Sequence, residues 1–362
     1  MRMKRILIAP MDWGLGHASR CIPVVEHLLA RGASVVLGGC GDSLALLRHR
    51  FPACASVELP SYAVRYSRRL HQGLAVLGQL PRLLRSIRAE ERLAPGLVHR
   101  LGIDGIIADN RYGLCAAPVP SAIICHQLQI PLPGSPAPAE QALYALHRQW
   151  LARYGQVWIP DWSDSPGLAG RMSHPQPLPP GARYLGPLSH LPRQAPPPSD
   201  PHLRRLAPPQ ILAVLSGPEP HRSLLEARLL DHLRDLPSWL VQGLPQVAAG
   251  RQEGAVSVIP FLGSSDLAWA LRQAGQVICR PGYSSVMDLA ALGQRRVLFV
   301  PTPGQGEQYA LARALAAARV APWQTQGQID LGTVSFAGYR GFEPPAADDR
   351  LAAVLDAWLG EP

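Results

Sequence analysis

Two glycine-containing segments of the 362-residue sequence combine side chains that could do chemistry. The first, residues 12–20, reads Asp-Trp-Gly-Leu-Gly-His-Ala-Ser-Arg and comes after a predicted strand at residues 5–9, which lies in the apolar run that begins at Ile6. Gly14 and Gly16 allow a tight turn into a helix, whose first amide groups can bind an anion. His17 suits a general base that deprotonates a hydroxyl, because the usual pKa of histidine is about 6.5. The alternative is a histidine that packs beneath the loop.

The second segment, residues 280–288, reads Arg-Pro-Gly-Tyr-Ser-Ser-Val-Met-Asp and also lies between a predicted strand and a predicted helix. Gly282 lets the backbone approach a ligand, and the helix expected near Ser284 points its positive end at a phosphate. Ser285 can donate to phosphate oxygens, Asp288 can accept from ribose hydroxyls, and Arg280 supplies positive charge for a diphosphate. An ordinary N-capped helix is the alternative. A serine-hydrolase elbow is excluded, because valine stands where that motif requires glycine.

The first segment also resembles part of a dinucleotide-binding fingerprint, which alone is a weak signal. A dehydrogenase requires an acidic residue at the end of the second strand to bind the ribose. The second predicted strand ends Val-Val-Leu-Gly-Gly at residues 35–39, without an acid. The sequence therefore disfavours a nicotinamide cofactor. We expect no cofactor and no bound metal, since no cluster of Asp and Glu resembles a metal site.

Short apolar runs alternate with helical patterns along the chain, which predicts an α/β fold with parallel sheets covered by helices. The expected strands are residues 5–9, 34–37, 56–59, 105–108, 121–125, 156–159 and 183–185, then 211–215, 239–241, 256–259, 276–279 and 296–300. A helix at residues 74–93 is expected to break or kink at Pro81. Between the two series, residues 187–209 contain eight prolines and little apolar periodicity, as linkers do.

This break predicts the domain organisation. Two Rossmann-like domains, residues 1–187 and 210–345, would be joined by a linker at 188–209. Residues 346–362 would form a C-terminal helix able to pack back on the first domain. We expect the two domains to face each other across a cleft, with ligands at the carboxyl ends of the strands.

The net charge of +9 comes almost entirely from arginine. Six arginines are interleaved with leucines in one stretch: Arg65, Arg68, Arg69, Arg82, Arg85 and Arg88. Such a segment can bind an anionic membrane surface, or it can be the solvated face of a helix. The solvated face is the more common role of such a pattern. No aromatic platform for nucleic acid accompanies the arginines. Without an apolar run of eighteen residues or a signal-peptide pattern, we expect a cytoplasmic protein, with peripheral contact at the inner face of the membrane as an option.

Together the two segments resemble GT-B glycosyltransferases, in particular glycosyltransferase family 28, which includes the lipid II-forming N-acetylglucosaminyltransferase, and the UDP-glucuronosyltransferase-like enzymes. The resemblance covers essentially the whole chain and is most specific between residues 256 and 315. Both groups share a basic residue, a glycine two positions on, a hydroxyl residue five on and an acid eight on, as in residues 280–288. The pairs Pro260-Phe261 and Glu307-Gln308 also match, as does the glycine loop that ends in His17.

The resemblance implies metal-independent, inverting transfer of a sugar from a nucleoside diphosphate donor, with UDP as the expected nucleotide, to an acceptor hydroxyl. His17 would be the base, and Asp109, at the end of a predicted strand, would orient it; turn capping is the alternative role for Asp109. The implied donor-binding residues are Gly14, Gly16, Ser216, Gly217, Phe261, Arg280, Gly282, Ser284, Ser285, Asp288, Glu307 and Gln308. The first domain would then bind the acceptor and the second the donor.

Three departures from the family pattern leave the sugar and the base of the donor open. Asp288 is shorter than the usual glutamate, Leu311 replaces a common asparagine, and residues 216–222 replace the usual Gly/Ser-rich turn. A nucleotide-sugar 2-epimerase and a nucleotide-sugar-binding protein without turnover are the alternatives. The acceptor, whether lipid-linked, a glycan or a small molecule, is also left open, as is the oligomeric state.

Overall fold

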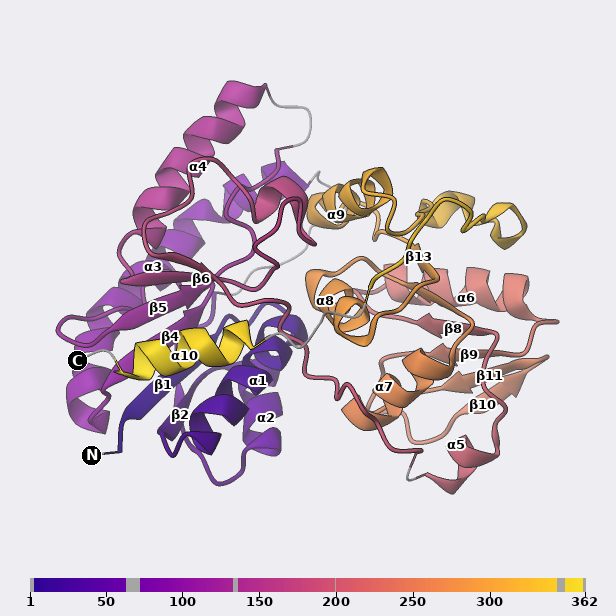
Figure 1. Ribbon diagram of the computed structural model, residues 1–362, viewed down its shortest axis with the longest axis horizontal. Coiled ribbons are helices and arrows are strands. Elements are labelled where there is room, and N and C mark those ends of the chain that lie inside the picture. Colours follow the sequence, from indigo (N-terminus) through magenta and orange to yellow (C-terminus); the bar gives the residue numbers. More distant parts are fainter. Residues whose placement is uncertain (1–2, 63–71, 133–135, 199, 344–348, 361–362) are drawn as a thin grey trace. The chain divides into compact units, whose positions relative to one another are not determined.

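The computed structural model describes residues 3–62, 72–132, 136–198, 200–343 and 349–360. The chain divides into two compact units (Figure 1). Unit 1 comprises Met1–His190 and Ala347–Pro362, and unit 2 comprises Leu191–Ala346. Of the basic stretch, residues 63–71 lie outside the described residues, so Arg65, Arg68 and Arg69 are not placed.

The described part of unit 1 contains a seven-stranded sheet in the order β3-β2-β1-β4-β5-β6-β7, with every neighbouring pair parallel. Its strands are β1 (Arg5–Pro10), β2 (Ser34–Gly39), β3 (Ala55–Glu58), β4 (Gly105–Asp109), β5 (Ser121–Ile124), β6 (Gln156–Ile159) and β7 (Ala182–Tyr184). The central strands are continuous apolar runs because helices cover both faces, and Ile6, Leu7 and Ile8 are fully buried.

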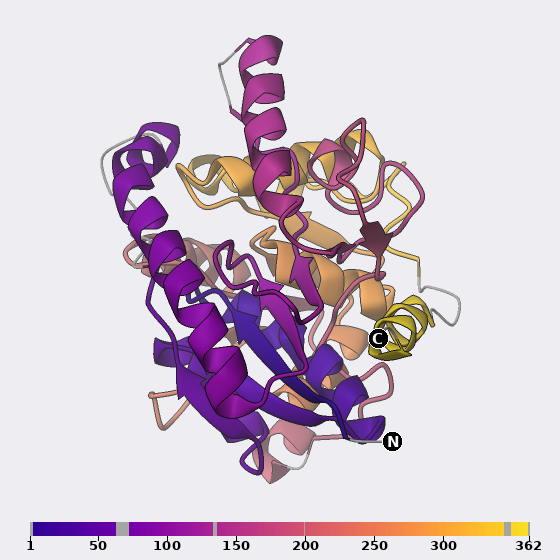
Figure 2. The same ribbon diagram turned by 90° about the vertical axis from the view of Figure 1, so that its left-hand side faces the viewer.

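The helices of unit 1 form two layers. They are α1 (Leu15–Ala30), α2 (Gly41–Arg50), α3 (Gln72–Leu101), α4 (Ala137–Leu151), the short η1 (Gly170–Met172) and α10 (Arg350–Gly360). Residues of α3 and α4 share a core with β1, β4 and β5, and α3 and α10 lie on opposite sides of the sheet (Figure 2). The expected break at Pro81 does not occur, since α3 continues through Pro81 and Pro95. Packing of its buried face onto this core offsets the hydrogen bonds that the prolines remove.

The final helix α10 packs on the first unit. The ring of Trp358 meets Trp158 of β6 edge-on, with 5.6 Å between the ring centroids. A Cβ at Gly105 would lie 2.6 Å from the Trp358 ring, so only glycine fits at the start of β4. Asp356 also accepts a hydrogen bond from His27 of α1 at 2.8 Å. A chain segment more than 160 residues beyond the sheet therefore completes its cover.

The described part of unit 2 contains a six-stranded sheet in the order β10-β11-β9-β8-β12-β13, parallel except for the edge strand β10. Its strands are β8 (Ile211–Val214), β9 (Ser238–Val241), β10 (Arg251–Glu253), β11 (Val256–Ile259), β12 (Gln276–Cys279) and β13 (Val297–Phe299). Its helices are α5 (Pro201–Arg205), α6 (His221–Leu233), α7 (Ser264–Gln273), α8 (Tyr283–Leu292) and α9 (Gly306–Ala317), with short turns η2 (Gln326–Gln328) and η3 (Leu331–Thr333).

Both sheets have a point where the strand order reverses, between β1 and β4 in unit 1 and between β8 and β12 in unit 2. The loops that leave two such strands run in opposite directions, which opens a crevice at the carboxyl edge where ligands bind in α/β proteins. The two Rossmann-like α/β sheets confirm the predicted fold class. His17 and Asp109 in unit 1, and Ser216, Gly217 and Arg280 in unit 2, lie at the ends of the strands at this point.

Candidate functional site

The loop after β1 and the end of β4 bring His17 and Asp109 together in unit 1. Gly14 begins the turn with a φ of 76°, in the left-handed region that favours glycine, and α1 follows at once. Asp109 is the last residue of the neighbouring strand β4 and is completely buried. Nδ1 of His17 lies 3.0 Å from Oδ1 of Asp109, while 13% of the His17 side chain remains exposed. The imidazole therefore contacts a buried carboxylate, while a small part of the side chain remains exposed to solvent.

Arg20 lies one helical turn after His17 and is also buried. Its Nε donates to Oδ2 of Asp109 and its Nη2 donates to Oδ1, so both carboxylate oxygens are occupied by one guanidinium. Nη2 lies 2.8 Å from Nδ1 of His17, and Nη1 lies 3.2 Å from Nδ1 of His126, which follows β5. Two histidines and one aspartate thus surround a single buried arginine.

This cluster keeps His17 uncharged and Asp109 charged. Burial lowers the pKa of His17 below its usual 6.5, the charge of Arg20 lowers it further, and Asp109 acts in the opposite direction. Burial alone would raise the pKa of Asp109, but the charges of Arg20 and His17 outweigh it and hold that pKa well below its usual range. A neutral imidazole beside an ionised carboxylate can accept a proton from a hydroxyl group.

A second buried network holds the loops around this cluster. Arg111 donates from Nε to the carbonyl oxygen of Pro10 at 2.8 Å and from Nη1 to that of Pro60 at 3.0 Å. Its Nη1 also lies 2.5 Å from Oε1 of Glu90 on α3, and Glu90 accepts a hydrogen bond from Tyr62 at 2.6 Å. The ends of β1 and β3 are therefore tied to α3, which fixes the start of the loop that carries His17.

In unit 2, Arg280 follows β12 at the corresponding point and is completely buried. Its Nη1 donates to the carbonyl oxygens of Val300 (2.9 Å) and Pro301 (3.1 Å). Its Nη2 donates to the carbonyl oxygen of His221 (3.0 Å) and to Oε1 of Gln326 (2.6 Å). Burial lowers the pKa of Arg280 to about 10, so it stays charged at neutral pH. The sequence predicted a guanidinium that faces a diphosphate, whereas its Nη atoms hold the loops after β8 and β13 together.

Four more of the predicted donor residues lie in the loop after β8 and in the first turn of α9, which follows β13. Ser216 and Gly217 follow β8 and are exposed, and Gly217 has a φ of 98° that favours glycine. A Cβ at Gly217 would lie 3.3 Å from Oγ1 of Thr302, so this turn passes closely over the threonine hydroxyl. Gln308 of α9 is buried, and its Oε1 accepts from the backbone N–H of Thr302 at 2.8 Å. Glu307 precedes it in the first turn of α9 and is half-buried.

The remaining predicted residues occupy α8 and the end of β11. Gly282 is the N-cap of α8, and Ser284, Ser285 and Asp288 are half-buried within it. The phenyl ring of Phe261 follows β11 and is 51% exposed. Since β11 is two strands away from β8, Phe261 lies roughly 10 Å along the same carboxyl edge. Arg280, Gly217 and Gln308 therefore all contact the segment Pro301-Thr302 or lie beside it. Phe261 lies apart from them.

Solved structures that resemble this chain over nearly its whole length include a glycosyltransferase. The glycosyltransferase SnogD from Streptomyces nogalater is 16% identical over 99% of this chain and 96% of its own, with a TM-score of 0.62. MurG from Acinetobacter baumannii is 16% identical over 99% of this chain and 100% of its own, with a TM-score of 0.60. UGT2 from Phytolacca americana, complexed with UDP-2-fluoro-glucose and pterostilbene, is 14% identical over 99% of this chain and 94% of its own, with a TM-score of 0.58.

The chain has the GT-B fold. Because the sequence identities are only 14–16%, these comparisons show a similarity of fold alone. No protein-family model matches the sequence, and no curated protein matches it either. The predicted resemblance in fold is confirmed over the full length of the chain, including the proline-rich segment.

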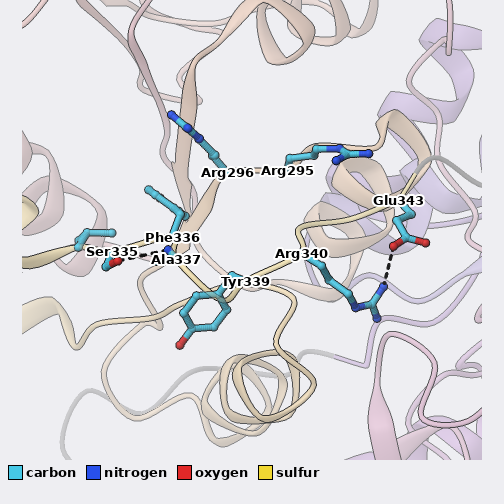
Figure 3. Close-up of a pocket in the computed structure, with 9 residues that line it drawn as sticks. Arg295, Arg296, Ser335, Phe336, Ala337, Tyr339, Arg340 and Glu343 are labelled. Atoms are coloured by element: carbon cyan, nitrogen blue, oxygen red, sulfur yellow. Dashed lines mark hydrogen bonds and ion pairs between the residues drawn. The ribbon is translucent and has the colours of Figure 1, made fainter.

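Unit 2 also has a cavity of about 690 Å³, whose lining residues are drawn in Figure 3. Arg295, Arg296, Tyr339 and Arg340 are among its lining residues, and Arg340 lies 3.7 Å from Glu343. Arg295 and Arg296 precede β13, so this cavity belongs to the amino end of the strand, opposite the edge that carries Arg280. Its exposed arginines are therefore not part of the candidate site.

Within the described ranges, no three His, Cys, Asp or Glu side chains gather as a metal-binding group. Among the same residues, no helix is both long and apolar enough to cross a bilayer.

Sequence reasoning missed Arg20, His126 and Thr302. Arg20 stands in the first motif, and its position three residues after His17 would have placed both on one helix face. His126 directly follows a predicted strand that ends at residue 125, so it carried a weak positional signal. Thr302 lies between two prolines outside any motif, and nothing in the sequence distinguished it.

Proposed function

We propose that this protein transfers a sugar from a nucleoside diphosphate donor, with UDP as the nucleotide, to an acceptor hydroxyl. The observation that carries the proposal is the pairing of a neutral, partly exposed His17 with the buried Asp109 on a GT-B fold. A base poised in this way is needed to activate a hydroxyl nucleophile and has no use in a protein that only binds.

In the proposed reaction, Nδ1–H of His17 donates to Asp109 and the lone pair of Nε2 takes the proton of the acceptor hydroxyl. The hydroxyl oxygen forms a bond to the anomeric carbon as the bond from that carbon to the phosphate oxygen breaks. The nucleoside diphosphate leaves with the electron pair, and attack from the opposite side inverts the anomeric configuration. No metal is required, because backbone amides and a fixed cation can stabilise the leaving charge.

Unit 2 offers the groups for that leaving diphosphate. The helices α6, α8 and α9 all begin at the carboxyl edge, and their first amide groups attract anions. The buried charge of Arg280 lies beneath the same loops. The exposed ring of Phe261 offers a stacking surface for the base, and Asp288 is assigned to the ribose. A UDP-sugar in the structurally similar Phytolacca enzyme supports the choice of uridine.

A panel of UDP-, dTDP- and GDP-sugars, each with and without candidate acceptors, tests the proposal by release of the nucleoside diphosphate. We expect one UDP-sugar to release UDP in the presence of acceptor, with excess chelator leaving the rate unchanged. NMR of the glycoside should show inverted configuration at the anomeric carbon. If excess chelator abolishes turnover, the reaction requires a metal, and only the metal-independent part of the proposal is wrong.

The same panel separates the alternatives. An epimerase would change the sugar, seen by NMR of the recovered donor, without stoichiometric transfer to an acceptor. A binding protein would retain the nucleotide sugar in calorimetry and show no turnover with any acceptor. Either result contradicts the proposed transferase reaction.

A further inference from the structure

The proposed reaction gives no role to the buried Arg20, although this residue contacts both proposed catalytic residues. Its guanidinium donates to both oxygens of Asp109, lies 2.8 Å from Nδ1 of His17 and 3.2 Å from Nδ1 of His126. These partners come from three places along the carboxyl edge: α1, the end of β4 and the segment after β5. Only 2% of the Arg20 side chain is exposed, so Arg20 belongs to the buried part of the candidate site.

The position of Nδ1 of His17 raises a question of protonation. This nitrogen lies between a donor, Nη2 of Arg20 at 2.8 Å, and an acceptor, Oδ1 of Asp109 at 3.0 Å. A neutral ring carries one proton, on Nδ1 or on Nε2. With the proton on Nδ1, the ring donates to Asp109 and Nε2 has a free lone pair. With the proton on Nε2, the ring accepts from Arg20 and Nε2 cannot act as a base.

Electrostatics favour the first form. A bare Nδ1 beside an ionised carboxylate would set two lone pairs against each other at 3.0 Å, whereas Nδ1–H donates a charge-assisted hydrogen bond to the same oxygen. Arg20 does not need the ring as an acceptor, since both oxygens of Asp109 already accept from it. The same two hydrogen bonds from Arg20 orient the carboxylate so that Oδ1 lies beside Nδ1 of His17.

We propose that Arg20 is a positioning residue that holds Asp109 against Nδ1 of His17 and thereby fixes Nε2 as the nitrogen that takes the proton. Its cation beside the ring also opposes protonation of His17. Arg20 thus gives the base its correct tautomer and keeps it neutral in mildly acidic solution. The inference rests on the proposed function only for its kinetic consequence, because tautomer and protonation are properties of the protein alone.

Other titratable groups around the ring do not supply this effect. The charged and titratable groups that influence His17 are Arg20, Asp109 and His126. The thiol of Cys21 lies 3.7 Å from Oδ2 of Asp109, and burial raises its pKa well above the usual value, so it stays neutral. Among the described residues around His17, Arg20 is the fixed cation and Asp109 the fixed anion.

The test is NMR of the full chain with ¹⁵N-labelled histidine. The signal of His17, one of twelve histidines, is assigned by its loss in His17→Asn. We expect the neutral ring to carry its proton on Nδ1 in the wild type. In Arg20→Gln the pKa of His17 should rise, because Asp109 then acts on the ring without an opposing cation. His49, which is exposed on α2, is the control, and its NMR signal should be the same in the variant and the wild type.

Arg20→Lys is the second variant, in case Arg20→Gln does not fold. Lysine keeps the charge but cannot donate to both carboxylate oxygens, so we expect a smaller rise in the pKa of His17 and a second, Nε2-protonated form. A proton on Nε2 in the wild type, or a pKa of His17 that neither variant changes, overturns the proposal. A lower melting temperature with the pKa and tautomer unchanged shows that Arg20 is only structural.

Kinetics provide the second readout once a donor and acceptor are known. The acidic limb of the profile of kcat/KM against pH reports the pKa of the base in the free enzyme. It should move to higher pH in Arg20→Gln, with kcat lowered and the KM for the donor unchanged. In a serine-protease triad, a wrong tautomer costs about 10⁴-fold in rate, which sets the upper limit. If no sugar nucleotide is turned over, the transferase proposal fails, while the NMR result still decides the role of Arg20.

Discussion

In unit 1, the buried Arg20 is paired with the buried Asp109, whereas the buried Arg280 of unit 2 is bonded to carbonyl and amide oxygens, with no carboxylate partner among the described residues. The nitrogens of Arg20 and the oxygens of Asp109 all have partners. At the edge of unit 2, three buried side-chain atoms have no hydrogen-bond partner within the described ranges: Nε of Arg280, Oγ1 of Thr302 and Nδ1 of His221. In unit 1, the buried Oδ1 of Asn110 also has none, so the contrast is between the two arginines and their partners.

The difference has a physical consequence. A buried donor without an acceptor costs about 1–3 kcal/mol, and a buried cation without an anion costs more. The hydrogen bonds of Arg20 and Asp109, which support the proposed base, are therefore complete without a ligand, as a preorganised catalytic group requires. The edge proposed to bind the donor has positive charge and free donors that an anionic ligand would satisfy.

The largest expected effect is on turnover, at the edge of unit 1. His17→Ala should lower turnover by about 10²–10⁴-fold, because the acceptor hydroxyl loses its base. Donor affinity measured by calorimetry should stay unchanged, since the donor-binding residues proposed on unit 2 are intact. His49→Ala, an exposed histidine on α2, is the matched control. Near-normal turnover would place the base elsewhere, and a loss that only follows a lower melting temperature would indicate a packing histidine.

The ion pair between Arg20 and Asp109 should contribute several kcal/mol to the free energy of unfolding. Asp109→Asn leaves the Arg20 cation buried and unpaired, and we expect a loss of about 3–5 kcal/mol in the free energy of unfolding. Turnover of the folded fraction should fall by less than in His17→Ala. Because the pKa of Asp109 is depressed in the folded state, this stabilisation is present above the unfolded pKa of about 3.9 and is lost as the pH falls below it.

Urea unfolding of Asp109→Asn measures this loss, with Asp42→Asn, an exposed residue on α2, as control. A change of less than 1 kcal/mol would remove the contrast between the two edges, since it would mean that Arg20 tolerates burial without its partner.

At the edge of unit 2, Asp288→Ala should weaken binding of the UDP-sugar by about 1–3 kcal/mol through lost ribose hydrogen bonds. Calorimetry on Asp288→Ala and on Asp231→Ala, an exposed residue of α6, measures the effect against a control on the same unit. Unchanged affinity would exclude Asp288 from the donor site. It would leave the role of the α8 N-terminus to be tested separately.

A smaller effect is expected from Thr302→Val, which keeps the shape of the side chain and removes a buried hydroxyl without a partner. We expect the free protein to gain about 1 kcal/mol of stability. The rise in melting temperature caused by saturating UDP should be smaller than in the wild type, because the ligand no longer satisfies that hydroxyl. Thr333→Val, at a hydroxyl bonded to the carbonyl oxygen of Asp330, should destabilise instead. If Thr302→Val lowers the stability of the protein as Thr333→Val does, the hydroxyl of Thr302 has a hydrogen-bond partner in the free protein, which contradicts the prediction.

The smallest effect concerns arginines that are exposed rather than buried. Arg82, Arg85 and Arg88 lie on α3 at three-residue spacing, and all three are exposed. If they bind an anionic membrane, Arg85→Ser should weaken binding to phosphatidylserine vesicles by about 1 kcal/mol at low ionic strength and by less as salt is added. Cosedimentation measures it, and absence of any salt-sensitive binding would indicate a solvated helix face.

The sequence alone determined the fold class, since parallel strands buried on both faces require continuous apolar runs and each strand-to-helix turn requires glycine or a cap. It also placed His17, Asp109 and the loop at Arg280 after strands, where α/β proteins bind ligands. Local patterns of this kind repeat within ten or so residues, so they can be recognised without knowledge of the fold. The antiparallel edge strand β10, only three residues long and exposed, carried no such pattern and was missed.

Only the tertiary structure decided which group each buried charge meets. Arg20 and Asp109 are 89 residues apart, and nothing periodic in the sequence connects them. Arg280 was assigned to a diphosphate from its motif, yet its Nη atoms bond to carbonyl oxygens and to Gln326, 46 residues further along the chain. A buried charge takes whatever acceptors the fold brings within about 3 Å, and that choice depends on how distant segments pack rather than on the residues beside it in sequence.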